Sequence, residues 1–218
     1  MYVASAARYI NNAGSIVLRR LRKAMPVWTI AIVLAFIGIV SHLPGTTAQA
    51  FADTSNSQGV SIDAGGSGDG GSFVADKYYS SGLTASNTTG SNGLITFSNT
   101  VAHPIPQADW NTYRYLENTY QVPNLTPGGV YQVRLYFLDW YFTKVGQRVF
   151  NVDVNGVPVL QNFDIVQAAV NAGGDGQYIG VEKDFTATAD ANGTVTVQFI
   201  RGSADQPMVN AIAVVPSS

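Results

Sequence analysis

The stretch from Val130 to Gly156 places the tightest constraint on how this chain can fold. Within it, residues 132–137 and 150–154 alternate between apolar and polar side chains. A period of two is typical of a strand that buries one face. Asn155 and Gly156 follow the second run, and this pair favours a tight hairpin because both residues accept a positive φ. The stretch therefore predicts two strands and a hairpin turn.

Residues 139–142, Asp-Trp-Tyr-Phe, lie between these two runs. Three adjacent aromatic rings cannot all enter a core from a strand, because neighbouring side chains point to opposite faces. We therefore expect at least one ring at the surface of a loop, where binding residues tend to collect.

The rest of the chain after residue 59 predicts an all-β, antiparallel β-sandwich whose two sheets bury alternate residues against each other. Short strands are expected, separated by turns rich in Gly, Asn and Pro, and residues 166–170 could form a single helical turn. The expected strands are 60–62, 94–97, 120–123, 132–137, 150–154, 159–165, 178–185, 194–200 and 210–215. Four aromatic residues between Trp110 and Tyr120 could face a ligand or fill the core. The glycine-rich segment 63–72 lacks the spacing of a phosphate-binding loop, so we expect an irregular loop at the mouth of the sandwich.

Residues 1–50 have the order of a secretory signal peptide. Basic residues 19–23 precede the apolar run 27–40, and Ala48-Gln49-Ala50 supplies a small-residue cleavage site. We expect cleavage after Ala50, a linker at 51–59 and one domain at 60–216. An uncleaved membrane anchor is the alternative, although the apolar run is short for a membrane span.

Charge and cysteine content exclude several classes of function. Residues 51–218 carry 7 basic and 14 acidic residues, a net charge of −7, which opposes binding to nucleic-acid phosphates. The sequence contains no cysteine, so it has no disulfide framework, thiolate metal site or cysteine nucleophile. A secreted chain without disulfides favours a bacterial extracellular origin.

Catalytic and metal-binding motifs are absent from the sequence. His103 is the only histidine after residue 50, and a lone histidine of this kind is more often structural. The only two glutamates, Glu117 and Glu182, lie in no recognisable motif. Loop aspartates could bind calcium, but their spacing matches no known loop, and solvated acids are the simpler interpretation. These aspartates are Asp63, Asp69, Asp175 and Asp205. We therefore expect no enzyme activity, no metal and no cofactor.

Residues 135–156, LYFLDWYFTKVGQRVFNVDVNG, resemble the signature of malectin and malectin-like domains, a family of carbohydrate-binding β-sandwiches. Three further blocks resemble the family in the same order: the opening at 62–66, the aromatic block at 73–79 and the last strand pair at 201–212. The resemblance spans nearly all of residues 60–215. It implies a jelly-roll-like or galactose-binding-like sandwich with a sugar site formed by loop aromatics and one aspartate.

Carried over position by position, the resemblance implies that Tyr141, Phe142, Tyr115 and Asp205 bind the ligand. The family's first site tyrosine has no counterpart here, because residues 86–93 contain only Ser, Thr, Asn and Gly. This departure leaves the identity of the ligand open.

Two further aromatic residues are weaker candidates for the site. Tyr79 could replace the missing tyrosine from earlier in the chain, and Trp140 could enlarge the binding platform. Arg148 matches the family pattern but is interpreted as structural, and it could pair with a loop acid such as Asp139.

The sequence therefore predicts a secreted or cell-surface module that binds a glucan-type oligosaccharide or glycan without chemistry. It predicts no nucleic-acid partner, and contact with a membrane only through an uncleaved leader. Two alternatives stay open. The chain could be a structural or adhesive module that binds protein, or an accessory domain that works with a separate glycoside hydrolase.

Overall fold

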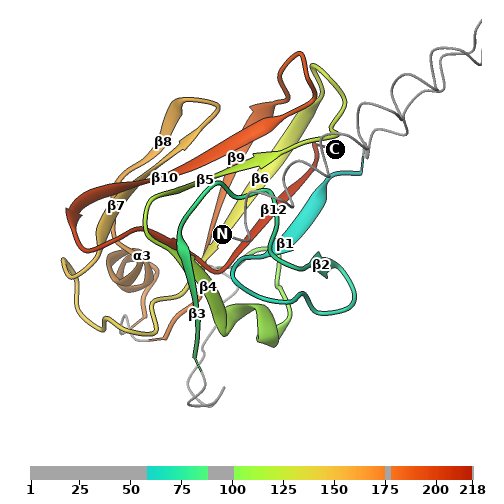
Figure 1. Cartoon of the computed structure of the whole chain (residues 1–218). Coiled ribbons are helices and arrows are strands. Elements are labelled where there is room, and N and C mark those ends of the chain that lie inside the picture. Colours follow the sequence, from blue (N-terminus) through green and yellow to red (C-terminus); the bar gives the residue numbers. More distant parts are fainter. Residues whose placement is uncertain (1–57, 88–100, 175–177, 218) are drawn as a thin grey trace, which may run out of the picture. The chain divides into compact units, whose positions relative to one another are not determined.

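The computed structural model describes residues 58–87, 101–174 and 178–217, which form a mainly antiparallel β-sandwich (Figure 1). The leader expected at 1–50, most of the linker at 51–59, the strand expected at 94–97 and Asp175 lie outside the described residues. The elements are β1 (Val60–Asp63), β2 (Phe73–Val74), β3 (Leu83–Ser86), the 3-10 turn η2 (Gln107–Trp110), β4 (Thr112–Tyr115), β5 (Asn118–Val122), β6 (Val130–Phe137), β7 (Val149–Val154), β8 (Val157–Phe163), α3 (Ile165–Asn171), β9 (Val181–Thr188), β10 (Val195–Ala204), β11 (Met208–Val209) and β12 (Ala211–Pro216). Neither helical segment in this part of the chain is long and apolar enough to cross a membrane.

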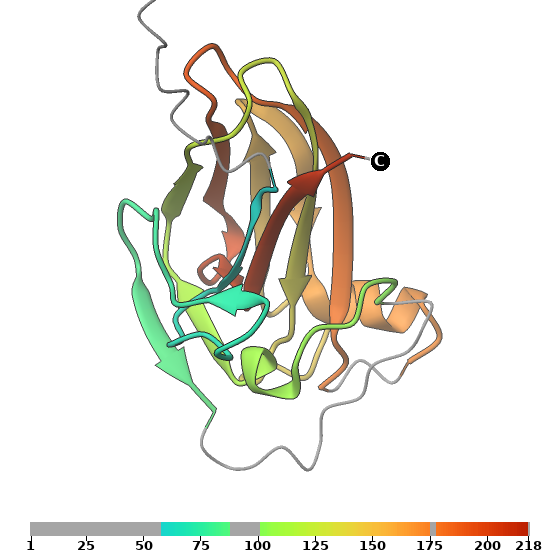
Figure 2. The same cartoon turned by 90° about the vertical axis from the view of Figure 1, so that its right-hand side faces the viewer.

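Two sheets form the layers of the sandwich, which Figure 2 shows nearly edge-on. One sheet has the order β2-β1-β12-β6-β9, and the other has the order β5-β10-β7-β8. β6 and β7 belong to different sheets, so the aromatic loop between them crosses from one layer to the other. The hairpin predicted at Asn155 and Gly156 joins β7 to β8, and both residues have positive φ, 51° and 74°.

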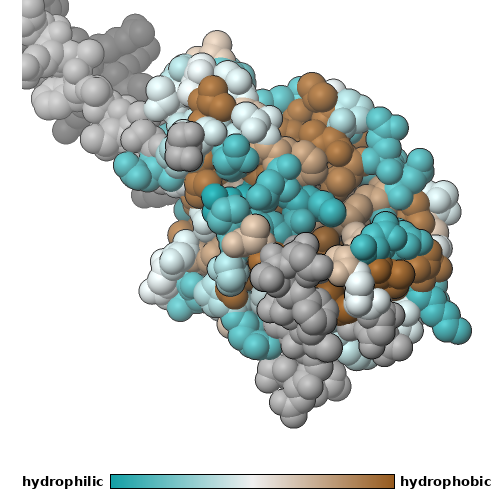
Figure 3. All heavy atoms as spheres, turned by 180° about the vertical axis from the view of Figure 1, so that it is seen from behind, coloured by the Kyte–Doolittle hydropathy of each residue, from teal (hydrophilic) through white to brown (hydrophobic). Residues whose placement is uncertain are grey.

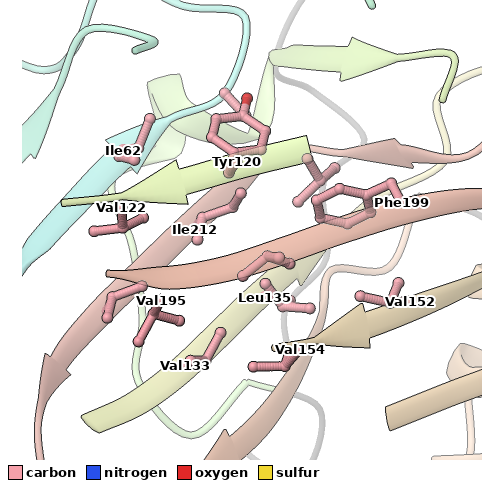
Figure 4. Packing of buried hydrophobic residues seen from close by; sticks show 14 of the residues in the cluster. Ile62, Tyr120, Val122, Val133, Leu135, Val152, Val154, Val195, Phe199 and Ile212 are labelled. Carbon is pink, nitrogen blue, oxygen red and sulfur yellow. The ribbon is translucent and has the colours of Figure 1, made fainter. Parts of the chain in front are cut away.

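The core lies between the two sheets and is filled by the alternating side chains that the sequence predicts. Val133, Leu135 and Phe137 of β6 are completely buried, as is Val152 of β7. Figure 4 shows the side chains of the two layers packing against each other. The Phe137 ring lies 4.9 Å from that of Phe163, a separation at which aromatic rings are in contact.

Tyr136 departs from the half-buried pattern expected of its strand. It points away from the core, yet it is only 2% exposed, because its ring packs edge-on against Trp110 of η2 and against Phe73. Its hydroxyl donates a hydrogen bond of 3.1 Å to the backbone carbonyl of His103. The segment before η2 therefore covers part of the outer face of the five-stranded sheet.

A third sheet, β11-β4-β3, lies beside the sandwich and was not predicted from the sequence. β3 and β4 pair antiparallel in the register Leu83 to Tyr115 and Ala85 to Tyr113, and the two-residue β11 pairs with the end of β4. This small sheet contains two of the four aromatic residues between Trp110 and Tyr120, namely Tyr113 and Tyr115.

A buried ion pair anchors the third sheet to the sandwich. Oδ2 of Asp76 accepts hydrogen bonds from Nε and Nη2 of Arg114 at 2.9 and 2.7 Å, and from the Gly65 amide at 2.7 Å. Oδ1 accepts from the Tyr120 hydroxyl at 2.8 Å. The Arg114 guanidinium also donates to the Ser81 carbonyl at 2.9 Å. Loop, small sheet and sandwich therefore meet at one carboxylate.

The first turn of the glycine-rich loop at 63–72 packs closely against the backbone of β4. Gly65 has a φ of 82°, and a Cβ added there would lie 2.4 Å from the Tyr113 carbonyl oxygen. Only glycine fits both the positive φ and this close approach. Asp63 holds the same loop by accepting hydrogen bonds from the Gly68 amide and the Thr112 hydroxyl.

Asp109 of η2 is buried, and neither of its carboxylate oxygens has a hydrogen-bond partner among the described residues. Burial, reinforced by the charges of Asp63 and Asp69, raises the pKa of Asp109 from 3.8 to about 7. The folded chain therefore binds a proton that the unfolded chain releases between about pH 4 and pH 7. Because the folded state binds more protons in this window, the free energy of unfolding falls as the pH rises through it.

We expect Asp109→Asn to remove this pH dependence. Above pH 7 the variant should be more stable than the parent chain by about 1–3 kcal/mol, and near pH 4 the difference should vanish. Urea unfolding of both chains across this pH range measures the difference. A difference that does not change with pH would show that Asp109 does not titrate in this window.

Candidate functional site

A cleft of about 260 Å³ opens where the third sheet meets two loops of the sandwich. Its lining comes from four separate parts of the chain: β3, β4, the β6–β7 loop and the β10–β11 connection. The lining residues are Ala85, Tyr113, Tyr115, Tyr141, Arg148, Asp205 and Gln206. The cleft therefore combines three tyrosine side chains with an arginine, a carboxylate and an amide.

The alternation of β4 decides which of its side chains reach the cleft. Tyr113 and Tyr115 lie on one face of the strand, with ring centroids 5.9 Å apart, and Arg114 points to the other face and binds Asp76. Burial raises the pKa of Tyr113 above its ordinary value of 10.0. Its hydroxyl is therefore protonated at neutral pH and can donate a hydrogen bond.

The Asp139 carboxylate orders the aromatic part of the β6–β7 loop. Its Oδ1 accepts hydrogen bonds from the backbone amides of Tyr141 at 3.0 Å and Phe142 at 2.8 Å. The Tyr141 side chain extends into solvent and the residue is 76% exposed. The Phe142 ring packs edge-on against Tyr141 at 4.8 Å and lies 5.1 Å from the Arg148 guanidinium. Phe142 therefore supports the exposed ring from beside the cleft.

Arg148 connects this loop to the acid on the other side of the cleft. Its Nε donates to Oδ2 of Asp139 at 2.7 Å, and its Nη1 donates to the Gln206 carbonyl at 2.6 Å. Nη1 also lies 2.9 Å from Oδ2 of Asp205. The expected pairing of Arg148 with Asp139 is confirmed. The three charged groups sum to −1, so the cleft does not carry excess positive charge.

Asp205 keeps part of its carboxylate available to solvent. Its side chain is 38% exposed, whereas that of Asp139 is 1% exposed. Asp205 also has a positive φ of 53°, which aspartate tolerates better than most residues. The tight turn before β11 therefore holds this carboxylate at the rim of the cleft.

The structure brings together three of the six candidate site residues, since Tyr115, Tyr141 and Asp205 all line the cleft. Phe142 lies beside it. Tyr79 does not reach it, because its ring covers the Arg114 guanidinium at 3.4 Å and packs edge-on against Tyr120.

Trp140 also lies away from the cleft. Its ring packs against Tyr178 at 5.3 Å, and its indole nitrogen donates to the Trp110 carbonyl at 2.6 Å. These contacts place Trp140 in the cluster that covers the outer face of the five-stranded sheet, and it does not widen the binding platform.

Besides Ala85, three lining residues were missed or were assigned another role in the sequence analysis. Tyr113 belonged to an aromatic run for which the sequence analysis assigned no face. The alternation Tyr-Arg-Tyr at 113–115 could have placed it on the same face as Tyr115. Arg148 was interpreted as structural only, whereas it also lines the cleft. No sequence pattern indicated that Gln206 lines the cleft, because its position depends on the turn at Asp205. Residues 88–93, most of the segment where the family's first tyrosine falls, lie outside the described residues.

Two larger hollows, of about 350 and 430 Å³, lie along β8. Their lining contains amide and acidic side chains together with Phe163 and Phe185, but no tyrosine or tryptophan. The smaller cleft is therefore the better candidate, because it combines aromatic faces with hydrogen-bonding groups at one place.

A β-sandwich with an aromatic cleft of this kind is typical of a ligand-binding module. Within that class, the family model described as the malectin domain matches residues 55–212. The chain belongs to the malectin family, whose domains bind carbohydrate.

Curated relatives agree with this assignment. "Malectin" of Danio rerio is 29% identical over 119 residues, which cover 51% of this chain and 41% of the relative. "Malectin" of Homo sapiens is also 29% identical over 119 residues, covering 51% of this chain and 40% of the relative. The matched segment therefore spans less than half the length of these relatives.

Solved structures show the same fold. The ectodomain of ANX2 from Arabidopsis thaliana superposes with a TM-score of 0.61 at 18% identity, covering 74% of this chain and 50% of that chain. The extracellular domain of ANXUR1 from the same plant gives a TM-score of 0.62 at 19% identity, covering 74% and 49%. A Bacteroides uniformis β-glucuronidase gives a TM-score of 0.56 at 17% identity, covering 77% of this chain and 19% of that enzyme.

We expect Asp139→Ala to disorder the aromatic loop and to lower the free energy of unfolding by about 3–5 kcal/mol. In the variant the buried Arg148 guanidinium loses one of its two carboxylate partners, and the backbone amides of Tyr141 and Phe142 lose their acceptor. Urea unfolding measures the loss, and hydrogen exchange at the Tyr141 and Phe142 amides should become faster.

Asp190→Ala is the matched control for this variant. Asp190 also accepts two backbone amides, from Asn192 and Thr194, but in an exposed turn and without an arginine partner. Its loss should cost about 1 kcal/mol. Equal losses in the two variants would show that the Arg148 pair does not stabilise the loop.

Proposed function

We propose that this chain is a secreted, non-catalytic module that binds glucose-containing oligosaccharides in the cleft between β4, the β6–β7 loop and Asp205. The observation that carries the proposal is the meeting of Tyr115, Tyr141 and Asp205 in one cleft, although they are distant in the sequence. Membership of the malectin family supports a carbohydrate as the ligand.

Aromatic stacking supplies the first part of the proposed mechanism. The faces of a pyranose carry apolar C–H groups, which pack on an aromatic ring while the tyrosine hydroxyl bonds to the edge of the sugar. Tyr141 offers an exposed ring on one side of the cleft, and Tyr113 and Tyr115 offer two half-buried rings on β4. A sugar unit placed between them would have one face covered and its edge within reach of phenol groups.

Hydrogen bonding supplies the orientation. The exposed oxygens of Asp205 can accept bonds from two neighbouring sugar hydroxyls, and the Gln206 amide can both donate and accept. Arg148 is already engaged by Asp139 and Asp205, so it fixes the carboxylate and does not attract anions. The net charge of −1 favours a neutral sugar over a sugar acid. Shallow sites of this kind bind at roughly mM to µM, about −4 to −8 kcal/mol.

The described part of the chain places no pair of carboxylates in the cleft for glycoside hydrolysis. Such a reaction normally uses two acids on either side of the bond, at least about 5 Å apart with the substrate between them. Among the described residues, Asp205 is the only acid that lines the cleft, and Asp139 behind it is buried and bonded to Arg148. This arrangement supports binding without chemistry.

Secretion is part of the same proposal. The basic, apolar and small-residue order of residues 1–50 supports export, with cleavage after Ala50. We expect the N-terminal sequence of the exported chain to begin at Phe51. An exported chain that begins at Met1 would contradict cleavage and favour an anchored form.

Calorimetric titration of the full chain with maltose, nigerose and β-linked gluco-oligosaccharides tests the binding site. We expect saturable binding to at least one of them, and a loss of at least about tenfold in Tyr141→Ala and in Asp205→Ala, which is about 1.4 kcal/mol for each. Tyr141 is exposed, so its substitution should leave the free energy of unfolding unchanged.

Tyr79→Ala is the matched control, because Tyr79 is also an exposed tyrosine but lies outside the cleft. It should bind the sugar like the parent chain. Absence of heat with every glucan would overturn the assigned ligand class and direct the search to other glycans or to a protein partner. Equal losses in all three variants would contradict the assigned cleft.

A further inference from the structure

Three side chains with metal-ligating atoms meet on the outer face of the five-stranded sheet, away from the cleft. Nδ1 of His103 lies 2.7 Å from Oε1 of Glu182 and 3.6 Å from Oδ2 of Asp184. One ligand atom from each residue lies within 4.8 Å of the other two. Figure 3 shows this outer face, with hydrophilic side chains gathered across its middle.

The fold brings the three residues together from two distant segments. Glu182 and Asp184 are two residues apart on β9, so their side chains leave the same face of the strand. His103 lies in the segment before η2, which runs along this face toward β9 (Figure 2). The histidine that has no partner in the sequence therefore has two carboxylates beside it in the structure.

Glu182 is held in place before any ligand arrives. Its side chain is 3% exposed, and its Oε2 accepts the backbone amide of His103 at 2.7 Å. The Tyr136 hydroxyl lies 3.4 Å from Oε1. Metal-binding carboxylates are commonly oriented by hydrogen bonds of this kind from a second layer of groups.

The charges on this face are unbalanced. Glu182 and Asp184 each bring a carboxylate, and Arg134, which pairs across the strands with Asp184, is the cation beside them. A cation bound between the two acids would relieve their repulsion.

We propose that His103, Glu182 and Asp184 form a binding site for a divalent transition metal, with Zn²⁺ as the best fit. One imidazole nitrogen and two carboxylate oxygens match the ligand preference of zinc, with water in the fourth position. The His103 and Asp184 side chains are 44% and 35% exposed, which leaves a path for the ion.

The distances suit this ion after a small adjustment. Ligand atoms of a tetrahedral zinc site lie about 3.4 Å apart, since each bond is about 2.0–2.1 Å long. The His103–Asp184 separation of 3.6 Å is already near this value. The His103–Glu182 separation must open by about 0.7 Å from its hydrogen-bonded 2.7 Å, which a half-exposed histidine can do by rotation. Bound metal would then fasten the segment that carries Trp110 to the edge strand β9.

The experiment is a calorimetric titration of the full chain, without a histidine tag, with zinc chloride. We expect one saturable site, weakened at least about tenfold in His103→Ala and in Asp184→Asn. The matched control is Asp153→Asn, which removes a half-buried aspartate from the other sheet. This control should bind zinc like the parent chain.

Nitrogen NMR of the His103 ring provides a direct readout, since zinc should shift its Nδ1 resonance. Absence of saturable zinc binding would overturn the proposal, as would zinc binding that survives in both ligand variants. Equal binding of Ca²⁺ or Mg²⁺ would also overturn it, because these ions prefer sites made only of oxygen. Sugar titration of the same variants keeps this test separate from the cleft, because neither ligand residue lines it.

Discussion

The buried pair between Asp76 and Arg114 is the interaction on which the arrangement of this molecule depends. Both side chains are less than a tenth exposed, and the Asp76 carboxylate is shared by a loop amide, a strand arginine and a core tyrosine. Removing one partner of such a pair generally costs about 3–5 kcal/mol, because the other charge stays buried. The pair fixes one face of β4, and the alternation of a strand then directs Tyr113 and Tyr115 to the opposite face. The stabilising contacts and the candidate ligand-binding face therefore use opposite sides of the same four-residue strand.

Arg148 orders the other wall of the cleft, as Arg114 orders β4. Because β6 and β7 belong to different sheets, the loop between them must cross the end of the sandwich, and its aromatic residues arrive there as a consequence of topology. Arg148 and Asp139 then give that crossing a defined shape, and Asp205 is positioned by the same guanidinium. Backbone amides and ion pairs thus organise the cleft in the unliganded chain, and such preorganisation would lower the entropy lost on binding the proposed sugar.

Local patterns predicted much of the fold, because they depend on neighbouring residues. Alternation placed Val133, Leu135 and Phe137 in the core, and Asn155-Gly156 marked the hairpin correctly. The third sheet could not be predicted, since its strands are short and held by the Asp76 contact across 38 residues. Tyr79 and Trp140 failed as cleft residues for the same reason: their partners, Arg114 and Trp110, are distant in sequence. For the cleft itself, the family resemblance supplied Tyr115, Tyr141 and Asp205, which the residues alone did not distinguish from core or turn positions.

The two long edge strands of the sandwich, β8 and β9, affect how readily the molecule associates with other copies of itself. An unpaired strand is a template for aggregation unless charge, proline or irregular pairing interrupts it. β9 carries Glu182, Lys183 and Asp184 in succession, and β8 combines Pro158 with two shifts of register against β7. Each long edge therefore opposes the addition of a strand from another molecule. The chain has no disulfide to stabilise its fold. Its resistance to aggregation at high concentration therefore depends on these two edge strands as well as on its core.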